Sequence, residues 1–371
     1  MNIKRYGSVA AVALAGTIVL SSCAANEAPA NTGTDSTNGG GAPASELEGN
    51  LSGIGSSAVG AAQEAWIAEF QDKNPGVTIN YAAEGSGAGR EAFLAGAANA
   101  NFAGSDRAFN DEEVAAGGWG ACASDEIVEL PLYISPIAVV FNLEGIETLN
   151  MDAATIAGIF NGDITTWDDE AIASQNEDAD LPDTAITPVH RSDDSGTTEN
   201  FTDYLFQAAP DVWTHEPDGL WPIEGGEAAD GTSGVIDAVS NASGTIAYAD
   251  ASRAGDLGTV AVEINGEYLE FSPEAAAAIV DASPRAEGRS AGDLAYELDR
   301  TPDEAAYPIA LVAYLIGCQD YSDDAVGELV KAYFSYMASE EGQQTAAESA
   351  GSAPISDAVR TEVESAIESI S

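Results

Sequence analysis

Short apolar runs of strand length alternate along this chain with apolar stripes at helical spacing, and small polar loops separate them. The run Val77–Tyr81 follows the turn signal Pro75-Gly76 and predicts a strand. Trp66 and Phe70 stand on one face of a predicted helix before it. Further helical stripes contain Phe93 and Leu94, then Phe201, Tyr204 and Leu205, then Leu329, Val330, Tyr333 and Phe334. The alternation predicts an α/β fold.

The N-terminal region has the pattern of an export signal. Residues 1–22 carry two early basic residues and then an apolar stretch that is too short to span a bilayer. Small residues precede Cys23, as in the lipobox of bacterial lipoproteins, so residues 1–22 are expected to be a lipoprotein signal peptide and Cys23 the lipidated residue. Residues 23–50 have no apolar periodicity and predict a disordered tether.

The charge balance restricts the class of partner. With 62 acidic and 12 basic residues the net charge is −50, which argues against nucleic acid because phosphate backbones require clustered Lys and Arg. An anion site remains compatible with this charge, since distant carboxylates are screened within roughly 8–10 Å at ordinary salt and short-range dipoles decide binding.

The cysteines fit an exported protein. If Cys23 carries lipid, Cys122 and Cys318 remain as an even pair in an oxidising compartment, which favours a disulfide between them. Free buried thiols are the alternative. The spacing of the cysteines and of His190 and His215 has no metal-site signature, and we expect neither a metal nor a cofactor.

One segment, 190–198, has the residue types of an anion-binding loop. It follows a predicted strand over 185–189 and precedes a predicted helix. Gly196 lets the backbone approach a ligand, and the hydroxyls and free N–H groups of Ser195, Thr197 and Thr198 are expected to point at that ligand above the helix start. Arg191 adds a cationic fork that Asp193 is placed to orient. Taken alone, the segment is equally typical of a capped helix with a surface ion pair.

Two more Gly/Ser loops precede predicted helices. They are Gly53–Gly60 and Glu84–Arg90, and the second lacks the third glycine of a dinucleotide fingerprint because Arg90 stands there. Its spacing suits a nest for one small anion. Asp106 ends a further predicted strand, at the carboxyl edge where open α/β sheets bind ligands.

These loops, in this order, resemble the phosphate-binding lipoproteins of the high-affinity phosphate ABC importer. The matching stretches span about residues 51–355, and Arg191–Thr198 and Phe160–Asp169 are the most specific of them. The resemblance implies an α/β, two-lobed periplasmic-binding-protein fold of type II, with the ligand in the cleft between the lobes and a two-crossing hinge. It implies no enzyme activity.

The resemblance also implies the roles of individual residues. Asp106 would accept the ligand's proton and Arg191 would clamp the anion. The donors would be Ser57, Ser86, Ser195, Gly196 and Thr197. The first loop matches least, since the family commonly has Thr-Phe where this chain has Ser57-Ala58. Trp167 is expected to fill the core rather than to touch ligand.

The order of the segments predicts how the chain divides. Lobe I is expected to comprise residues 51–133 and 249–371, and lobe II residues 134–248. Cys122 and Cys318 then fall in the same lobe. The protein is expected to be a monomer, exported and anchored through Cys23 to the outer face of the cytoplasmic membrane, where it would deliver phosphate to ABC permease subunits.

Two other functions compete with this one. A binding protein for sulfate or molybdate is the nearer alternative, but a site for such deprotonated dianions should lack Asp106. A phosphatase-like enzyme could use Ser195 as nucleophile or Asp106 as base. The chain has only two histidines and no Gly-x-Ser-x-Gly elbow, which favours binding over catalysis.

Overall fold

The computed structural model describes residues 47–120, 122–302 and 306–371. The predicted signal peptide, Cys23 and most of the predicted tether lie outside these residues. The last residues of the predicted tether are ordered: residues 48–50 belong to strand β1 (Glu48–Gly55) and pair in parallel with β2 (Gly76–Ala82). None of the helices in the described residues combines the length and apolarity needed to cross a bilayer.

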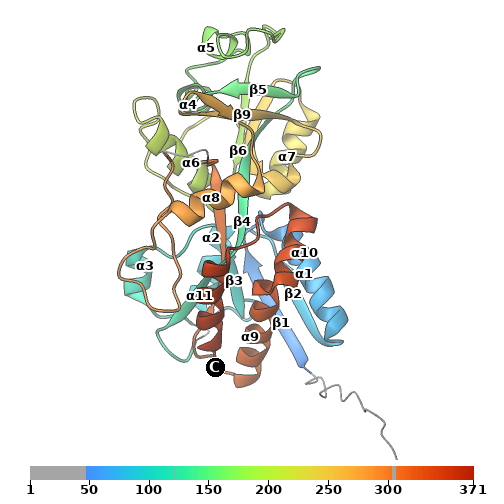
Figure 1. Ribbon diagram of the computed structural model, residues 1–371, viewed down its shortest axis with the longest axis vertical. Helices are drawn as coiled ribbons and strands as arrows, with labels where there is room; N and C mark the ends of the chain where they lie inside the picture. Colours follow the sequence, from blue (N-terminus) through green and yellow to red (C-terminus); the bar gives the residue numbers. More distant parts are fainter. Residues whose placement is uncertain (1–46, 121, 303–305) are drawn as a thin grey trace, which may run out of the picture. The chain divides into compact units, whose positions relative to one another are not determined.

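Strands of the described residues pair into one connected system in which β4 (Ile127–Phe141) belongs to two parts. Residues 127–136 of β4 pair with β11, and residues 137–141 pair with β8. We call the two parts the first and second sheets. The first sheet has the order β2-β1-β3-β11-β4 and the second β4-β8-β6-β7, with β9 bridging β4 to β5 and β10. Figure 1 shows β4 running from the first group of strands into the second.

The remaining strands are β3 (Phe102–Ser105), β5 (Thr148–Met151), β6 (Thr187–Arg191), β7 (Glu227–Ala229), β8 (Thr245–Asp250), β9 (Gly258–Ile264), β10 (Glu267–Leu269) and β11 (Ala310–Cys318). The helices are α1 (Gly60–Lys73), α2 (Ser86–Ala95), α3 (Asp111–Ala116), α4 (Ala153–Asn161), α5 (Glu170–Ala173), α6 (Gly196–Ala208), α7 (Gly231–Asn241), α8 (Pro273–Ala282), α9 (Asp324–Ala338), α10 (Glu340–Ala350) and α11 (Asp357–Glu368), with a 3-10 turn at Ala251–Arg253.

The apolar stripes of the sequence form the core. Trp66 and Phe70 of α1 are buried with Tyr333 and Phe334 of α9 beside the first sheet, and Phe102 lies edge-on to both α9 rings. Phe201, Tyr204 and Leu205 of α6 are buried as well. The predicted periodicities therefore correspond to the faces that pack on the sheets.

Strand pairing shows where the chain returns to the first sheet. Strands β9 and β10 follow residue 248, yet they extend the second sheet through β4 and β5. The chain rejoins the first sheet only at β11, whose Ala310 pairs with Pro136. In β4, the change of partner from β11 to β8 falls between Pro136 and Ile137.

Cys122 and Cys318 form a disulfide, with 2.05 Å between the sulfur atoms. The bond joins the segment after α3 to the last residue of β11, so both ends belong to the first sheet and its connections. The pairing favoured by the cysteine count is therefore present.

Candidate functional site

The predicted ligand loops all begin at the carboxyl ends of strands and lead toward helix starts. Loops after β1, β2 and β6 lead to α1, α2 and α6, and Asp106 follows β3 directly. Strands β1, β2 and β3 run parallel, so their carboxyl ends lie at one edge of the first sheet. The first N–H groups of each helix lack partners within the helix and favour an anion there.

Asp106 is buried within this group of loops and is 3% exposed. Its Oδ2 accepts a hydrogen bond of 3.1 Å from the Thr197 hydroxyl, and its backbone N–H donates to Ser86 Oγ at 3.1 Å. Oδ1 is also buried and has no hydrogen-bond partner among the described residues. Burial raises the pKa of the Asp106 carboxyl, while the nearby Ser56 hydroxyl and the charge of Arg191 act to lower it.

Arg191 is held by Asp193 in the predicted orientation. Its Nε donates to Asp193 Oδ1 at 2.7 Å, and a terminal nitrogen donates to Asp193 Oδ2, so the contact is bidentate. Burial acts to raise the pKa of Asp193, but the hydrogen bonds and charge of Arg191 outweigh burial and hold that pKa below its ordinary value. The side chain of Arg191 is 3% exposed, so the guanidinium is a fixed cation in a region of low dielectric.

The start of α6 meets Asp106 and Ser86 closely. Ser195 caps the helix, and its Oγ accepts from the N–H of Thr198. A Cβ on Gly196 would stand 2.7 Å from the Cβ of Asp106 and 2.8 Å from Ser86 Oγ, so only glycine allows this approach. The structure thus brings together Ser86, Asp106, Ser195, Gly196 and Thr197.

Thr198 differs from expectation. The sequence suggested that its hydroxyl faces the ligand together with those of Ser195 and Thr197. Instead Thr198 Oγ1 lies 2.8 Å from the hydroxyl of Tyr248, on β8. Residues 197 and 198 point to different sides because successive helical positions are rotated by about 100°. Thr198 therefore links α6 to β8 of the second sheet through this hydrogen bond.

Ser57 contacts a fourth helix start, that of α7, which was not among the predicted ligand loops. Its Oγ lies 3.0 Å from Thr232 Oγ1 and accepts from the N–H of Thr232 at 3.2 Å. The N–H of Gly231 donates to Asp193 Oδ1, which links α7 to the Arg191 clamp. The triplet Asp230-Gly231-Thr232 before a helical run is the same cue that identified the other loops, so this one could have been found.

Asn200 and Ser56 were also missed. Asn200 Nδ2 donates to the Asp106 carbonyl at 2.7 Å, and Ser56 is fully buried, with its hydroxyl accepting from the N–H of Ala58. No local pattern singles out Asn200, because its partner is 94 residues away. Ser56 lies inside a loop that was recognised, but the loop motif did not distinguish it from Ser57.

Two residues of the stretches that resemble the family are buried in the apolar core. Trp167 is fully buried, and its indole N–H donates to the Gly244 carbonyl at 3.1 Å, as expected of a packing residue. Ala58 is 1% exposed and belongs to the main apolar cluster.

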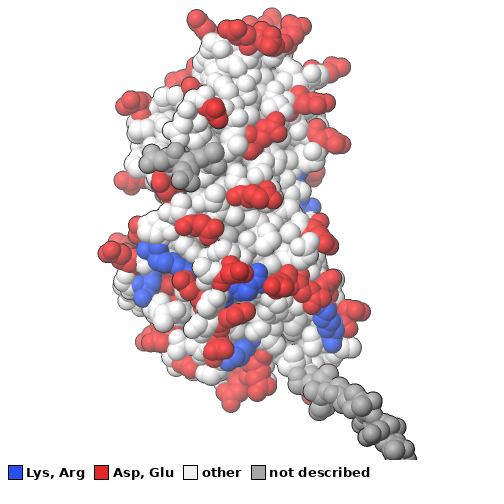
Figure 2. Space-filling model, viewed as in Figure 1, with Lys and Arg blue, Asp and Glu red and all other residues white. Residues whose placement is uncertain are grey.

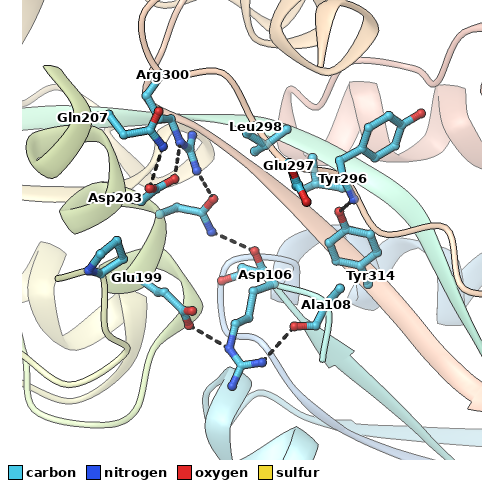
Figure 3. A pocket seen from close by; sticks show the side chains of 14 residues that line it. Asp106, Ala108, Glu199, Asp203, Gln207, Tyr296, Glu297, Leu298, Arg300 and Tyr314 are labelled. Atoms are coloured by element: carbon cyan, nitrogen blue, oxygen red, sulfur yellow. Dashed lines mark hydrogen bonds and ion pairs between the residues drawn. The ribbon is translucent and has the colours of Figure 1, made fainter. Parts of the chain in front are cut away.

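A pocket of about 360 Å³ adjoins Asp106 on the side of α6. Figure 3 shows Glu199, Asp203 and Gln207 on its one side and Tyr296, Glu297 and Leu298 on the other. Arg300 also lines the pocket and pairs with Asp203 at 2.8 Å. Arg107, the other arginine of the lining, lies 2.9 Å from Glu199, so both cations are already paired with carboxylates.

The surrounding surface is acidic. On the face drawn in Figure 2, Asp and Glu side chains occur throughout, whereas most of the few basic side chains lie in its lower half. The buried site differs from this surface in combining a fixed guanidinium, helix starts and hydroxyls with one carboxylate. Such a set suits a small oxyanion that carries at least one proton, because the proton relieves the repulsion of Asp106 Oδ1.

Comparison with protein-family models matches residues 28–341 to the PBP superfamily domain. The phosphate-binding protein PstS3 of Mycobacterium bovis is 32% identical over 386 residues, covering 100% of both chains. Phosphate-binding protein PstS 3 of Mycobacterium leprae is 31% identical over 381 residues, again covering 100% of both chains.

Solved structures show a similar fold. A high-affinity periplasmic phosphate-binding protein, solved with phosphate bound, superposes with a TM-score of 0.67 at 22% identity, covering 85% of this chain and 93% of that one. The similarity extends over both sheets and is consistent with the two-lobed architecture implied by the sequence.

Proposed function

Because the chain belongs to the PBP superfamily and to the PstS phosphate-binding protein family within it, we propose that it captures inorganic phosphate and delivers it to an ABC-type importer. The single observation that carries the proposal is Asp106. Its buried Oδ1, without a partner among the described residues, lies in a site with the Arg191 cation. Phosphate at neutral pH keeps a proton that this oxygen can accept.

Phosphate would bind between the two lobes, which we identify with the two sheets and their helices. Arg191, Ser195, Gly196 and Thr197 would contribute from lobe II, and Ser57, Ser86 and Asp106 from lobe I. The hydrogen bonds that already join Ser57 to Thr232 and Asp106 to Thr197 support a cleft that closes on its ligand. The activity is binding and release, without chemistry on the phosphate.

Delivery implies a place at the membrane. We propose that the protein acts outside the cytoplasm as a monomer, held by lipid on Cys23, and docks on permease subunits. The sequence before residue 47 supports the anchor, since it has a signal pattern and a lipobox. The variant Cys23→Ala should therefore leave the membrane fraction and appear in the soluble exported fraction, and a variant still bound to membrane would contradict the anchor.

Calorimetric titration of the ligand-free protein with phosphate, sulfate and molybdate tests the proposed ligand. We expect phosphate to bind much more tightly than the other two, and Arg191→Ala to weaken phosphate binding by several kcal/mol while the protein stays folded. Arg285 lies away from the Arg191 loop, is 29% exposed and pairs with Glu362, so Arg285→Ala is a matched control that should bind as the wild type does. Equal affinity for the three anions would refute the proposal.

A further inference from the structure

Three arginines of the first-sheet side each meet a carboxylate on α6 or in the turn before it. Arg90 of α2 lies 3.3 Å from Asp194, and Arg107, which follows β3, lies 2.9 Å from Glu199. Arg300 lies 2.8 Å from Asp203, and its guanidinium also donates to the carbonyls of Pro308 and Ala310 at the start of β11. These contacts join the two lobes at points beside the anion site.

Asn200 connects these pairs to the site itself. Its side-chain oxygen accepts from the Arg300 guanidinium, while Nδ2 donates to the backbone carbonyl of Asp106 at 2.7 Å and to that of Gly196. Arg300, anchored to β11, thereby fixes the first turn of α6 against the loop that carries Asp106. Figure 3 shows Arg300 and Asp203 joined by a dashed line within this arrangement.

The carboxylates of these pairs would repel an anion in the site unless the cleft is closed and the arginines neutralise them. Asp194, Glu199 and Asp203 add negative charge next to a proposed anion site in a chain of net charge −50. In the closed arrangement each is neutralised by an arginine, and the Arg90 and Arg300 side chains are 5% and 2% exposed. Opening the cleft separates the partners and leaves the carboxylates facing the ligand's charge.

We propose that Arg90–Asp194, Arg107–Glu199 and Arg300–Asp203, together with Asn200, form a latch that sets how long the lobes stay closed over the ligand. The latch rests on the proposed function. None of its residues is among the proposed phosphate contacts, so we expect them to position the lobes and to act on the rate of release. The Arg107 pair is suited to opening, because Arg107 also pairs with Glu113 on its own side at 2.7 Å and keeps that partner when the lobes part.

The test uses the full chain with Glu199→Gln and Asp203→Asn combined, and phosphate as the probe. Dissociation should be at least tenfold faster, with the association rate changed less than threefold. The matched control is Glu341→Gln with Glu362→Gln, which changes the net charge equally but removes pairs with Lys73 and Arg285 that lie away from α6. The control should keep the wild-type rates.

Simple electrostatics predicts the opposite change in the dissociation rate. Two fewer negative charges beside an anion site should tighten binding, so slower or unchanged dissociation in the latch variant would overturn the proposal. Thermal unfolding without ligand shows whether the variant is folded. If the double variant does not fold, Glu199→Gln alone is measured, since its pair is partly exposed and Arg107 retains Glu113.

Small-angle scattering separates the latch from the proposed function. The latch variant should have a larger radius of gyration than the control in the same buffer. If the wild type fails to bind phosphate, the proposed function is refuted. The difference in radius of gyration between the latch variant and the control then still tests whether the three pairs hold the lobes closed. Identical radii for the variant and the control, together with identical release rates where phosphate binds, would leave no role for the three pairs in closure.

Discussion

At the scale of single residues, Asp106 decides which anion is accepted. Two like charges 4 Å apart repel by about 4 kcal/mol at an effective dielectric of 20, and phosphate relieves this with a proton that sulfate lacks. Asp106→Asn, which can donate as well as accept, should lower the preference for phosphate over sulfate by at least about tenfold, or roughly 1.4 kcal/mol. Competition binding measures it. An unaltered preference would place selectivity in the Ser86 or Ser195 loops.

A second buried carboxyl, Asp250, should make stability depend on pH. It lies where β8 pairs with β4 and accepts hydrogen bonds from Tyr133, and burial raises its pKa from 3.8 to about 6. A raised pKa means that the folded state holds the proton more tightly, so the stabilisation is complete below about pH 3.8 and is lost as pH rises to about 6.

Asp250→Asn should therefore gain stability relative to the wild type as pH rises from 4 to 7. Two pKa units correspond to roughly 3 kcal/mol, so we expect a relative gain of about 1–3 kcal/mol. Denaturant unfolding at several pH values measures it, with the exposed Asp72→Asn as control. Parallel pH curves for wild type and Asp250→Asn would contradict the linkage.

At the scale of elements, the start of α6 limits how closely the lobes approach. Gly196→Ala would place a methyl group 2.7 Å from the Cβ of Asp106. The closed cleft should then be strained, and phosphate affinity should fall at least tenfold, whereas the ligand-free protein should not be less stable because alanine favours a helix. Titration and thermal unfolding measure the two effects.

Gly234→Ala is the control for that substitution. It lies in the early part of α7, where a Cβ would meet only ordinary contacts at 3.7 Å. Its phosphate affinity should equal that of the wild type. Wild-type affinity in Gly196→Ala would mean that the loops of Asp106 and α6 are not pressed together in the bound state.

At the scale of the whole molecule, the Cys122–Cys318 bond restrains the unfolded chain. It closes a loop with a sequence separation of 196, so the double variant Cys122→Ser/Cys318→Ser should lose about 2–5 kcal/mol of unfolding free energy. Guanidinium unfolding measures this, and phosphate affinity should be retained because the bond lies outside the site. Equal midpoints for the variant and the oxidised wild type would show that the bond contributes nothing to stability.

The sequence by itself determined the local features of this protein. Strand ends, helix starts and the Arg191–Asp193 pair follow from residues within a few positions of each other, because capping, glycine turns and apolar periodicity are short-range effects. That is why the loops carrying Ser86, Asp106 and Ser195 were identified, and why the stripes of α1, α6 and α9 were predicted as core.

Only the tertiary structure decided how distant residues meet. Asn200 with Asp106, Ser57 with Thr232 and Arg300 with Asp203 are separated by 94, 175 and 97 residues, and no local pattern encodes such pairs. They depend on the order of strands in the sheets, on β4 serving both of them, and on β9 returning to the second. Those arrangements are set by global packing, since many strand orders bury the same apolar faces equally well.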